Sequence, residues 1–378
     1  MRILHVITSL STGGAEMMLQ KLLYGLSSRQ YTSTVVSLTT IMPIGDELRA
    51  AGIPVVGMNG RSGMLTPRQL WQLARIYKDT QPDVIHAWMY HSNVVAQMLI
   101  GLRSQRSRPG LILSVRGALH APKEQKVTSR LIRTLDAMMS SRSDAIVFNS
   151  RRAAEQHAAL GYDRKKIHVI PNGFDVDRFG AMPTERARLR SELGCNDVTL
   201  VGLVARFDRL KGQRVFLEAA RLVADASARY KFLLVGRGCD GANEELSRWI
   251  AELSLAGSVH LLGERRDIAA IDNALDIAVC SSISESFPNA IGEAMACGVP
   301  CVVTDVGDCG FLIGESGFIV PTRQPRALAD AIIRMGELSD SGRAALGARA
   351  RQRVVTEFSI ASVVKRFSEL YDRHGRRP

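Results

Sequence analysis

Short apolar runs alternate with longer amphipathic segments along most of the chain. Residues 2–8, RILHVIT, are almost continuously apolar, as is typical of parallel strands buried on both faces. Helices are expected from about Glu16 to Leu26, at 67–80, from about 213, from Pro288, and at 325–337, 341–356 and 360–372. Further strands are expected at 32–38, 54–58, 83–88, 111–117, 145–150, 199–205, 231–236, 259–268, 300–307 and 317–321. This alternation predicts βαβ units in open parallel sheets, which bind ligands at the carboxyl ends of their strands.

Two domains are expected from the length, because a domain typically has about 150 residues and the chain has 378. We place the boundary near Gly173, in a Pro-Asn-Gly turn that follows a short strand. Residues 1–173 contain 22 Lys and Arg against 10 Asp and Glu, whereas the remainder contains 27 of each sign. A basic first half suggests an anionic partner: lipid headgroups, a pyrophosphate-linked acceptor or nucleic acid. A merely soluble basic surface would have the same composition.

The compartment is inferred from the apolar runs and the cysteines. No apolar run approaches the ~18 residues that span a membrane, and the N-terminal run lacks the cleavage site of a signal peptide. All six cysteines follow residue 190 without a CxxC pair, so reduced thiols and a cytoplasmic protein are expected. A zinc site around Cys297, Cys301 and Cys309 is the weaker alternative, because neither His nor paired spacing supports it.

The most informative stretch is residues 280–300, CSSISESFPNAIGEAMACGVP. If Pro288 opens a helix, the first N–H groups of that helix, at 289–291, form a seat for a phosphate or a sugar hydroxyl. Glu285 and Glu293 flank this seat about 10 Å apart, so they would hold different parts of one extended ligand. Each carboxylate can accept two hydrogen bonds from adjacent ribose or hexose hydroxyls. The alternative is a structural helix with two solvated acids.

Two cations follow the strand expected at 199–205. Arg206 and Lys211 could neutralise a diphosphate without a metal ion, or they could be solvated loop charges. A second loop, GRGCDG at 236–241, has the formal G-x-G-x-x-G spacing of dinucleotide-binding proteins, with Glu264 as the ribose acid. NAD binding fits poorly, because this loop belongs to the second βα unit of its half and does not open a domain.

The run E-S-F-P-N-A-x-G-E at 285–293 resembles the E-x7-E motif of retaining glycosyltransferases of the family-four type. The Pro-Asn-Gly run at 171–173 and the Arg206, Lys211 pair resemble two further signatures of this family, in the same order. The resemblance implies the GT-B fold, an α/β architecture in which two Rossmann-like parallel-sheet domains face an interdomain cleft. The implied domains are an acceptor-binding domain at 1–173, a nucleotide-sugar-binding domain at 174–358, and a C-terminal helix at 359–378 that returns to the first domain.

The resemblance also implies roles for residues. Glu285 would touch the donor sugar, Glu293 would hold the ribose, and Arg206 and Lys211 would bind the diphosphate, with no metal ion or cofactor. Arg265, or equally Arg266, would lie beside the base. The other residues implied at the donor are Gly14, Asn172, Ser286, Phe287, Pro288, Asn289 and Ile291.

Three polar side chains, His86, His91 and Arg116, come at or near the ends of strands expected in the first half. In the resembled family a His after the strand corresponding to 111–115 is often placed against the donor sugar, and here Arg116 occupies that position. A guanidinium cannot act as a base, although it can bind phosphate or a sugar oxygen. Either His91 or His120 would take over the contact, or none is needed.

Residues 123–142 predict a basic amphipathic helix. One face carries Val127, Leu131, Leu135, Met138 and Met139, with Lys123, Lys126, Arg130 and Arg133 around it. Such a helix could lie on an anionic membrane or pack on the sheet as an ordinary helix. The resembled family often binds membranes through its N-terminal half.

The predicted reaction is therefore retaining, metal-independent transfer of a sugar from a UDP- or GDP-sugar to an acceptor hydroxyl. The acceptor would be a lipid-linked, polysaccharide or lipopolysaccharide intermediate, and the protein would be cytoplasmic with peripheral attachment to the inner face of the membrane. A nucleotide-sugar 2-epimerase of the same fold is the first alternative, and it would need no acceptor. A basic nucleic-acid-binding protein is the second and would bind with steep salt dependence, but the chain lacks interleaved basic and aromatic residues.

Overall fold

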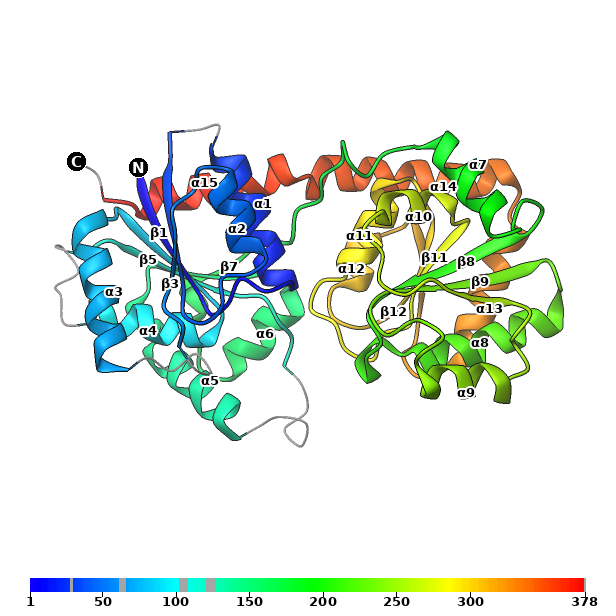
Figure 1. Ribbon diagram of the computed structural model, residues 1–378, viewed down its shortest axis with the longest axis horizontal. Coiled ribbons are helices and arrows are strands. Elements are labelled where there is room, and N and C mark those ends of the chain that lie inside the picture. The colour runs from blue at the N-terminus through cyan, green and yellow to red at the C-terminus, as the bar shows by residue number, and fades with distance from the viewer. Residues whose placement is uncertain (28–29, 61–65, 102–107, 120–126, 377–378) are drawn as a thin grey trace. The chain divides into compact units, whose positions relative to one another are not determined.

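The computed structural model describes residues 1–376 except 28–29, 61–65, 102–107 and 120–126. Its contacts divide the chain into two compact units. The first unit comprises Met1–Gly173 with Ile360–Pro378, and the second comprises Phe174–Ser359. Each unit is built on one parallel sheet with helices on both faces (Figure 1).

The sheet of the first unit has seven parallel strands in the order β3-β2-β1-β4-β5-β6-β7. Successive strands are added outward from β1 on one side and outward from β4 on the other. The strand order therefore reverses between β1 and β4, although all strands stay parallel. The strands are β1 (Arg2–Ile7), β2 (Thr32–Ser37), β3 (Val55–Gly57), β4 (Val84–Trp88), β5 (Gly110–Val115), β6 (Ala145–Phe148) and β7 (Ile167–Val169).

Two hydrophobic layers cover the faces of this sheet. One layer joins alternate strand residues to α1, α2 and α15, and the other joins the intervening residues to α3, α4 and α6. The two layers form because successive side chains of a strand point to opposite faces. The helices are α1 (Gly14–Ser27), α2 (Ile44–Ala50), α3 (Pro67–Thr80), α4 (Tyr90–Ile100), α5 (Val127–Met139), α6 (Arg151–Ala159) and α15 (Ile360–His374), with short 3-10 turns at Ser140–Arg142 and Arg164–Lys166.

The sheet of the second unit has six parallel strands in the order β10-β9-β8-β11-β12-β13. It repeats the arrangement of the first, with the reversal between β8 and β11. The strands are β8 (Thr199–Val204), β9 (Tyr230–Val235), β10 (Val259–Leu261), β11 (Ile277–Cys280), β12 (Cys301–Thr304) and β13 (Gly317–Val320).

Helices cover both faces of this second sheet as well. One hydrophobic layer contains α8, α9 and α13, and the other contains α10, α11, α12 and α14 with Phe174 and Phe358. The helices are α7 (Pro183–Glu192), α8 (Gln213–Ala226), α9 (Glu244–Glu252), α10 (Ile268–Ala274), α11 (Asn289–Ala296), α12 (Cys309–Ile313), α13 (Pro325–Glu337) and α14 (Asp340–Arg353). A 3-10 turn spans Arg209–Lys211, and a π-helical turn spans Val354–Phe358.

The expected parallel sheets are confirmed, and two local expectations are corrected. Helix α11 begins at Asn289, because Pro288 has an extended ψ of 95° and lies at the N-cap. His86 lies inside β4 and is fully buried, where its ring contacts Tyr371 Oη and Ser114 Oγ, each at 2.7 Å. Burial lowers the pKa of His86 well below its usual value, so it is a neutral core residue and not a ligand at a strand end.

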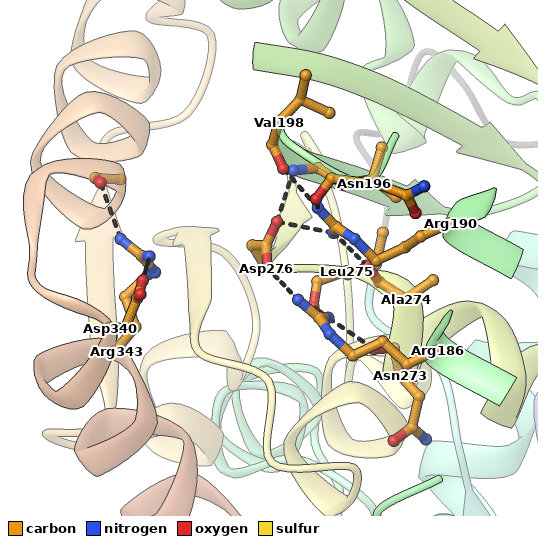
Figure 2. A network of polar contacts seen from close by, with 12 residues as sticks. Arg186, Arg190, Asn196, Val198, Asn273, Ala274, Leu275, Asp276, Asp340 and Arg343 are labelled. Atoms are coloured by element: carbon orange, nitrogen blue, oxygen red, sulfur yellow. Dashed lines mark hydrogen bonds and ion pairs between the residues drawn. The ribbon is translucent and has the colours of Figure 1, made fainter. Parts of the chain in front are cut away.

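Asp276 anchors α7 to the amino ends of β8 and β11 (Figure 2). Its two oxygens accept hydrogen bonds from Arg186 at 2.5 Å and Arg190 at 2.9 Å, and the Leu200 amide donates at 2.8 Å. Both guanidinium groups also donate to backbone carbonyls, among them those of residues 273–275 and 198. This network lies at the end of the strands opposite to their carboxyl ends, so we assign it to stability.

We expect Asp276→Ala to lower the free energy of unfolding of the second unit by about 3 kcal/mol, because a mostly buried Arg190 would lose its carboxylate. Asp340→Ala is the matched control, since Asp340 also pairs with an arginine, Arg343, but is 97% exposed. Urea titration measures both changes. Equal losses in the two variants would contradict the assignment.

A second buried carboxylate, Asp136, ties α5 to α4. It accepts hydrogen bonds from Asn93 Nδ2 at 2.9 Å, Gln97 Nε2 at 2.8 Å and Tyr162 Oη at 2.8 Å. Burial raises the pKa of Asp136 to about 7, although these three donors act in the opposite direction. The side chain is thus held by three neutral donors, and its charge adds to burial in raising the pKa of Tyr90.

Because the pKa of Asp136 is raised, we expect its contribution to the free energy of unfolding to depend on pH. Between about pH 4 and pH 7 the folded protein keeps a proton that the unfolded chain has lost, so the stability of the wild type relative to Asp136→Asn falls as the pH rises. The difference should become constant above about pH 7. Free energies of unfolding of both proteins across this range measure it, and the other titrating groups cancel because both proteins share them. A difference that does not vary with pH would refute the prediction.

Candidate active site

The candidate site of the second unit lies where its strand order reverses. The chain leaves β8 in the loop at 205–212 (the β8 loop) and leaves β11 in the loop at 281–288 (the β11 loop), and these two strands are neighbours. Ligands of open parallel sheets bind outside the carboxyl ends of strands at such a point. The GRGCDG loop at 236–241 instead follows β9, one strand away from the reversal.

The β8 loop and the β11 loop are held together by hydrogen bonds to backbone carbonyl oxygens of the β8 loop. Ser281 Oγ lies 3.0 Å from the carbonyl oxygens of both Lys211 and Gly212, and the Ile283 amide donates to the Leu210 carbonyl at 2.8 Å. Gly212 has a φ of +69°, and a Cβ there would lie 2.1 Å from the Ser281 carbonyl oxygen. Only glycine fits both the backbone conformation and the space, so Gly212 permits the close approach of the two loops.

This approach pairs Lys211 with Glu285. Lys211 Nζ lies 2.5 Å from Glu285 Oε1, and Ser282 Oγ donates to the same oxygen at 2.9 Å. Gly307 packs behind Glu285, because a Cβ at position 307 would lie 2.3 Å from the Glu285 carbonyl oxygen. The cation expected at the diphosphate and the acid expected at the sugar are therefore side by side in a mostly buried pair.

Arg206, the other expected cation, is more exposed. Its guanidinium lies 2.8 Å from Asp208 Oδ2. Burial raises the pKa of Asp208, but the Leu210 amide and Arg206 outweigh burial and lower it, so Asp208 stays ionised. Arg265, in the loop after β10, is likewise paired with Asp267 at 2.5 Å. Arg206, Lys211 and Arg265 thus each have a carboxylate neighbour.

The amino end of α11 follows the β11 loop directly, as a phosphate seat requires. The end of β12 and the segment after it hold the β11 loop in place. The Asp308 amide donates to the Ser286 carbonyl at 3.0 Å, and Thr304 Oγ1 donates to the Ser282 carbonyl at 2.7 Å. Pro288 and Asn289 lie at the helix start.

Two expected donor residues point into the core. The Phe287 ring stacks on Phe174 with centroids 6.2 Å apart and packs near Phe358, and Ile291 belongs to the same hydrophobic cluster. Burial leaves only the backbone of these two residues to meet a ligand, which agrees with a seat formed by backbone N–H groups, and the donor contact itself stays a prediction.

Glu293 has an acidic neighbour that the sequence analysis missed. Asp272, on α10, is fully buried, and neither of its carboxylate oxygens has a hydrogen-bond partner among the residues that the structure describes. Burial raises the pKa of Asp272 well above its usual value, and the charge of Glu293 raises it further. A neutral acid thus lies close to Glu293. The available signal was an aspartate inside the otherwise apolar start of the run IAAIDNA.

In the first unit, Gly14 and His91 lie at the corresponding reversal of strand order. Gly14 starts α1 after β1, and His91 is the second residue of α4 after β4. The two connections meet at a 3.2 Å contact between Thr8 Oγ1 and Ser92 Oγ. Burial lowers the pKa of His91, which keeps its imidazole neutral and able to accept a proton.

Glu16 in this region was also missed as a site candidate. It lies in the first turn of α1 and accepts a hydrogen bond from Ser9 Oγ at 3.1 Å. Burial raises the pKa of Glu16. The signal was an acid placed directly after Gly13, Gly14 and Ala15.

Arg116 and Asn172 bind each other inside the first unit. Arg116 Nε and a terminal nitrogen donate to Asn172 Oδ1 at 3.1 and 2.6 Å, and the same terminal nitrogen donates to the Ile170 carbonyl at 3.3 Å. The guanidinium lies over Trp88 and Phe367, and burial lowers its pKa to about 9. Both side chains are buried and hold the 170–173 turn, and Arg116 Nη1 has no hydrogen-bond partner among the residues that the structure describes, so their expected contact with the ligand stays a prediction. His120 lies outside the described residues.

Comparisons with known proteins decide the family. Residues 12–178 match the model of Glycosyltransferase Family 4, and residues 198–337 match that of Glycosyl transferases group 1. The D-inositol 3-phosphate glycosyltransferase of Corynebacterium urealyticum is 30% identical over 311 residues, which cover 76% of this chain and 71% of the relative. The chain belongs to glycosyltransferase family 4.

Other members differ in how much of their length is matched. The Escherichia coli UDP-Gal:alpha-D-GlcNAc-diphosphoundecaprenol alpha-1,3-galactosyltransferase is 24% identical, with 87% of this chain and 84% of the relative covered. The chain spans only 60% of the D-inositol 3-phosphate glycosyltransferase of Corynebacterium jeikeium, to which it is 32% identical.

Solved structures confirm the GT-B fold of this family-four glycosyltransferase. Anabaena HepE in complex with UDP superposes with a TM-score of 0.87 at 23% identity, over 99% of this chain and all of that one. A glycosyltransferase from Rickettsia africae superposes with a TM-score of 0.82 at 22% identity, with 98% of each chain covered.

Proposed function

We propose that this glycosyltransferase transfers a sugar from a UDP-sugar to a hydroxyl of a lipid-linked glycan acceptor, with retention and without a metal ion. The observation that carries the proposal is the junction of the β8 loop and the β11 loop, where Lys211, Glu285 and the amino end of α11 meet at the reversal of strand order. UDP is favoured over GDP because Anabaena HepE is solved with UDP and with UDP-glucose.

Lys211 would carry the largest catalytic effect. Its ammonium has three N–H donors, so it can keep its hydrogen bond to Glu285 and still donate to a diphosphate oxygen. Arg206 and the first N–H groups of α11 would add positive charge at the same leaving group, which serves the purpose that a metal ion serves elsewhere. The charge that grows on the departing UDP would thus be stabilised by groups already in place.

Glu285 would orient the donor sugar and Glu293 the ribose. Glu285 is fixed by Lys211 and Ser282, which leaves its second oxygen to accept from sugar hydroxyls. With Glu285 neutralised by Lys211, a nucleophilic role is disfavoured, and the transfer proceeds on the front face. The anomeric C–O bond to UDP breaks, the acceptor oxygen bonds to the same face, and its proton passes to the leaving phosphate.

The acceptor is proposed from the named relatives. The Escherichia coli relative acts on a sugar-diphosphoundecaprenol, and a Campylobacter jejuni relative of similar coverage is named for a diphospho-undecaprenol acceptor. A polyprenyl-diphosphate acceptor is anionic, which suits the excess of Lys and Arg in residues 1–173. The enzyme would then work at the surface of a membrane that holds this acceptor.

The direct test incubates the protein with a panel of UDP- and GDP-sugars and an undecaprenyl-diphosphate-linked sugar, with and without EDTA. Extended lipid-linked product, with the anomeric configuration of the donor by NMR and no effect of EDTA, is expected with a UDP-sugar. Loss of activity in EDTA, an inverted product, or sugar interconversion without acceptor would each contradict the proposal; the last would indicate the epimerase.

Two variants separate the proposed roles. Lys211→Ala should lower kcat by about 100-fold or more while changing the Kd for UDP less, because the interaction strengthens as charge develops on UDP. Glu293→Ala should chiefly raise the Kd for UDP. Arg209→Ala is the matched control, since Arg209 is an exposed cation of the same loop. Unchanged turnover in Lys211→Ala would remove the diphosphate role from this residue.

A further inference from the structure

Two cysteines meet beside the β11 loop. Cys280 is the last residue of β11, and Cys309 is the first residue of α12. Both are buried in one hydrophobic cluster, and their thiols are hydrogen-bonded to each other. They come together because β12 pairs with β11 and the chain passes from β12 to α12 through residues 305–308 alone.

The two thiols differ in how readily they ionise. The hydrogen bond from Cys309 lowers the pKa of Cys280 below its usual value, although burial acts in the opposite direction. The same hydrogen bond, together with burial, raises the pKa of Cys309 well above its usual value. Burial alone makes a structural cysteine unreactive, whereas a thiol with a lowered pKa beside a second thiol is the arrangement found in redox-active pairs.

A short chain of contacts joins Cys280 to the ion pair of the candidate site. Cys280 Sγ lies 3.4 Å from Ser282 Oγ, and Ser282 Oγ donates to Glu285 Oε1 at 2.9 Å. The same Glu285 oxygen accepts a hydrogen bond from Lys211 Nζ. One hydroxyl group therefore separates the sulfur of Cys280 from the acid that would orient the donor sugar.

Cys309 is coupled to the same loop through the two residues that precede it. The Asp308 amide donates to the Ser286 carbonyl at 3.0 Å, and a Cβ at Gly307 would lie 2.3 Å from the Glu285 carbonyl oxygen. These contacts leave no space between the two segments. A movement of Cys309 would therefore displace the backbone that carries Glu285.

We propose that Cys280 and Cys309 form a redox-modification site, at which hydrogen peroxide joins the two sulfurs in a reversible disulfide and so disables the donor site. The Cys280 thiolate attacks one peroxide oxygen, the O–O bond breaks, and Cys280 becomes a sulfenic acid. The Cys309 sulfur then attacks the sulfenic sulfur, and the S–O bond breaks. Two electrons pass from the thiols to the peroxide, whose two oxygens leave as water with the two thiol protons.

The disulfide would change the candidate site by shortening the contact between the two residues. A covalent bond holds two sulfurs closer together than a hydrogen bond between two thiols does. Cys309 would move toward β11, and residues 305–308 would press on the β11 loop, so Glu285 would no longer be held beside Lys211. The inference rests on the proposed function in one respect, because it takes this ion pair as part of the donor site.

Cys301 is a nearby thiol that serves as the matched control. It is fully buried in the same cluster, on β12 opposite Ala278, which lies two residues before Cys280. Its sulfur lies 3.3 Å from the Val299 carbonyl oxygen, and burial raises its pKa. Cys301 thus resembles Cys309 in burial, but it is engaged with a backbone carbonyl and stays protonated.

Mass spectrometry of the full chain after treatment with hydrogen peroxide tests the modification itself. No Lys or Arg lies between Arg266 and Arg323, so cleavage after Glu and before Asp is needed to place Cys280, Cys301 and Cys309 on separate fragments. We expect a disulfide between the fragments of Cys280 and Cys309 that dithiothreitol removes. Cys301→Ser should form the same bond, and Cys309→Ser should form none.

Two measurements on the reduced and the oxidised protein test the effect on the site. Oxidation should raise the Kd for UDP at least tenfold, and dithiothreitol should restore it. The amide hydrogens of residues 282–289 should exchange faster with deuterium in the oxidised protein, a result that does not require UDP to be the ligand. Cys309→Ser and Cys309→Ala should keep their affinity for UDP after the same treatment, and far-UV circular dichroism shows that both variants are folded.

Several results would overturn the inference. They are the absence of a disulfide in the wild type, a disulfide from Cys280 to Cys301, and an equal loss of UDP affinity in Cys309→Ser. A disulfide between Cys280 and Cys309 that leaves amide exchange or the Kd for UDP unchanged would overturn it as well. A disulfide with faster exchange, in a protein whose reduced form binds no UDP, would instead refute the proposed function alone.

Discussion

The close approach of the β8 loop to the β11 loop is the contact on which the candidate site depends. It is possible because residue 212 has no Cβ and because Ser281 Oγ reaches the carbonyls of Lys211 and Gly212. Lys211 and Glu285, 74 positions apart in the chain, become an ion pair as a result. The strand order reverses between β8 and β11, where such sheets bind ligands, and α11 begins directly after the β11 loop that carries Glu285.

Much of the fold could be predicted from local pattern. The central strands β1, β4, β5, β8 and β11 are buried on both faces and appear as apolar runs, and α3 and α13 keep the bounds expected from Pro67 and from 325–337. The contacts that side chains make with one another could not be predicted in this way. The pairing of Lys211 with Glu285, the burial of Phe287, and the Arg116 contact with Asn172 each depend on segments that are distant in the sequence. The pattern of apolar and polar residues predicts the helix or strand on which a residue lies, but it does not predict which residue that side chain contacts.

The α5 helix is a second case in which the sequence predicts the helix but not the contacts of its side chains. Its sequence is equally compatible with an ordinary core helix and with a helix on a membrane, because both have one apolar side. The choice is made by Asp136, whose three neutral donors come from α4 and from the segment after α6. A buried carboxylate thus holds α5 with Val127, Leu131, Leu135 and Met138 exposed.

The central claim is that the junction of the β8 loop and the β11 loop binds the diphosphate of the donor. A crystal structure of the protein with UDP tests it most directly. We expect phosphate oxygens within hydrogen-bonding distance of Lys211 Nζ and of the first N–H groups of α11, with the ribose hydroxyls on Glu293. A well-ordered UDP away from residues 206–211 and 285–293 would contradict it.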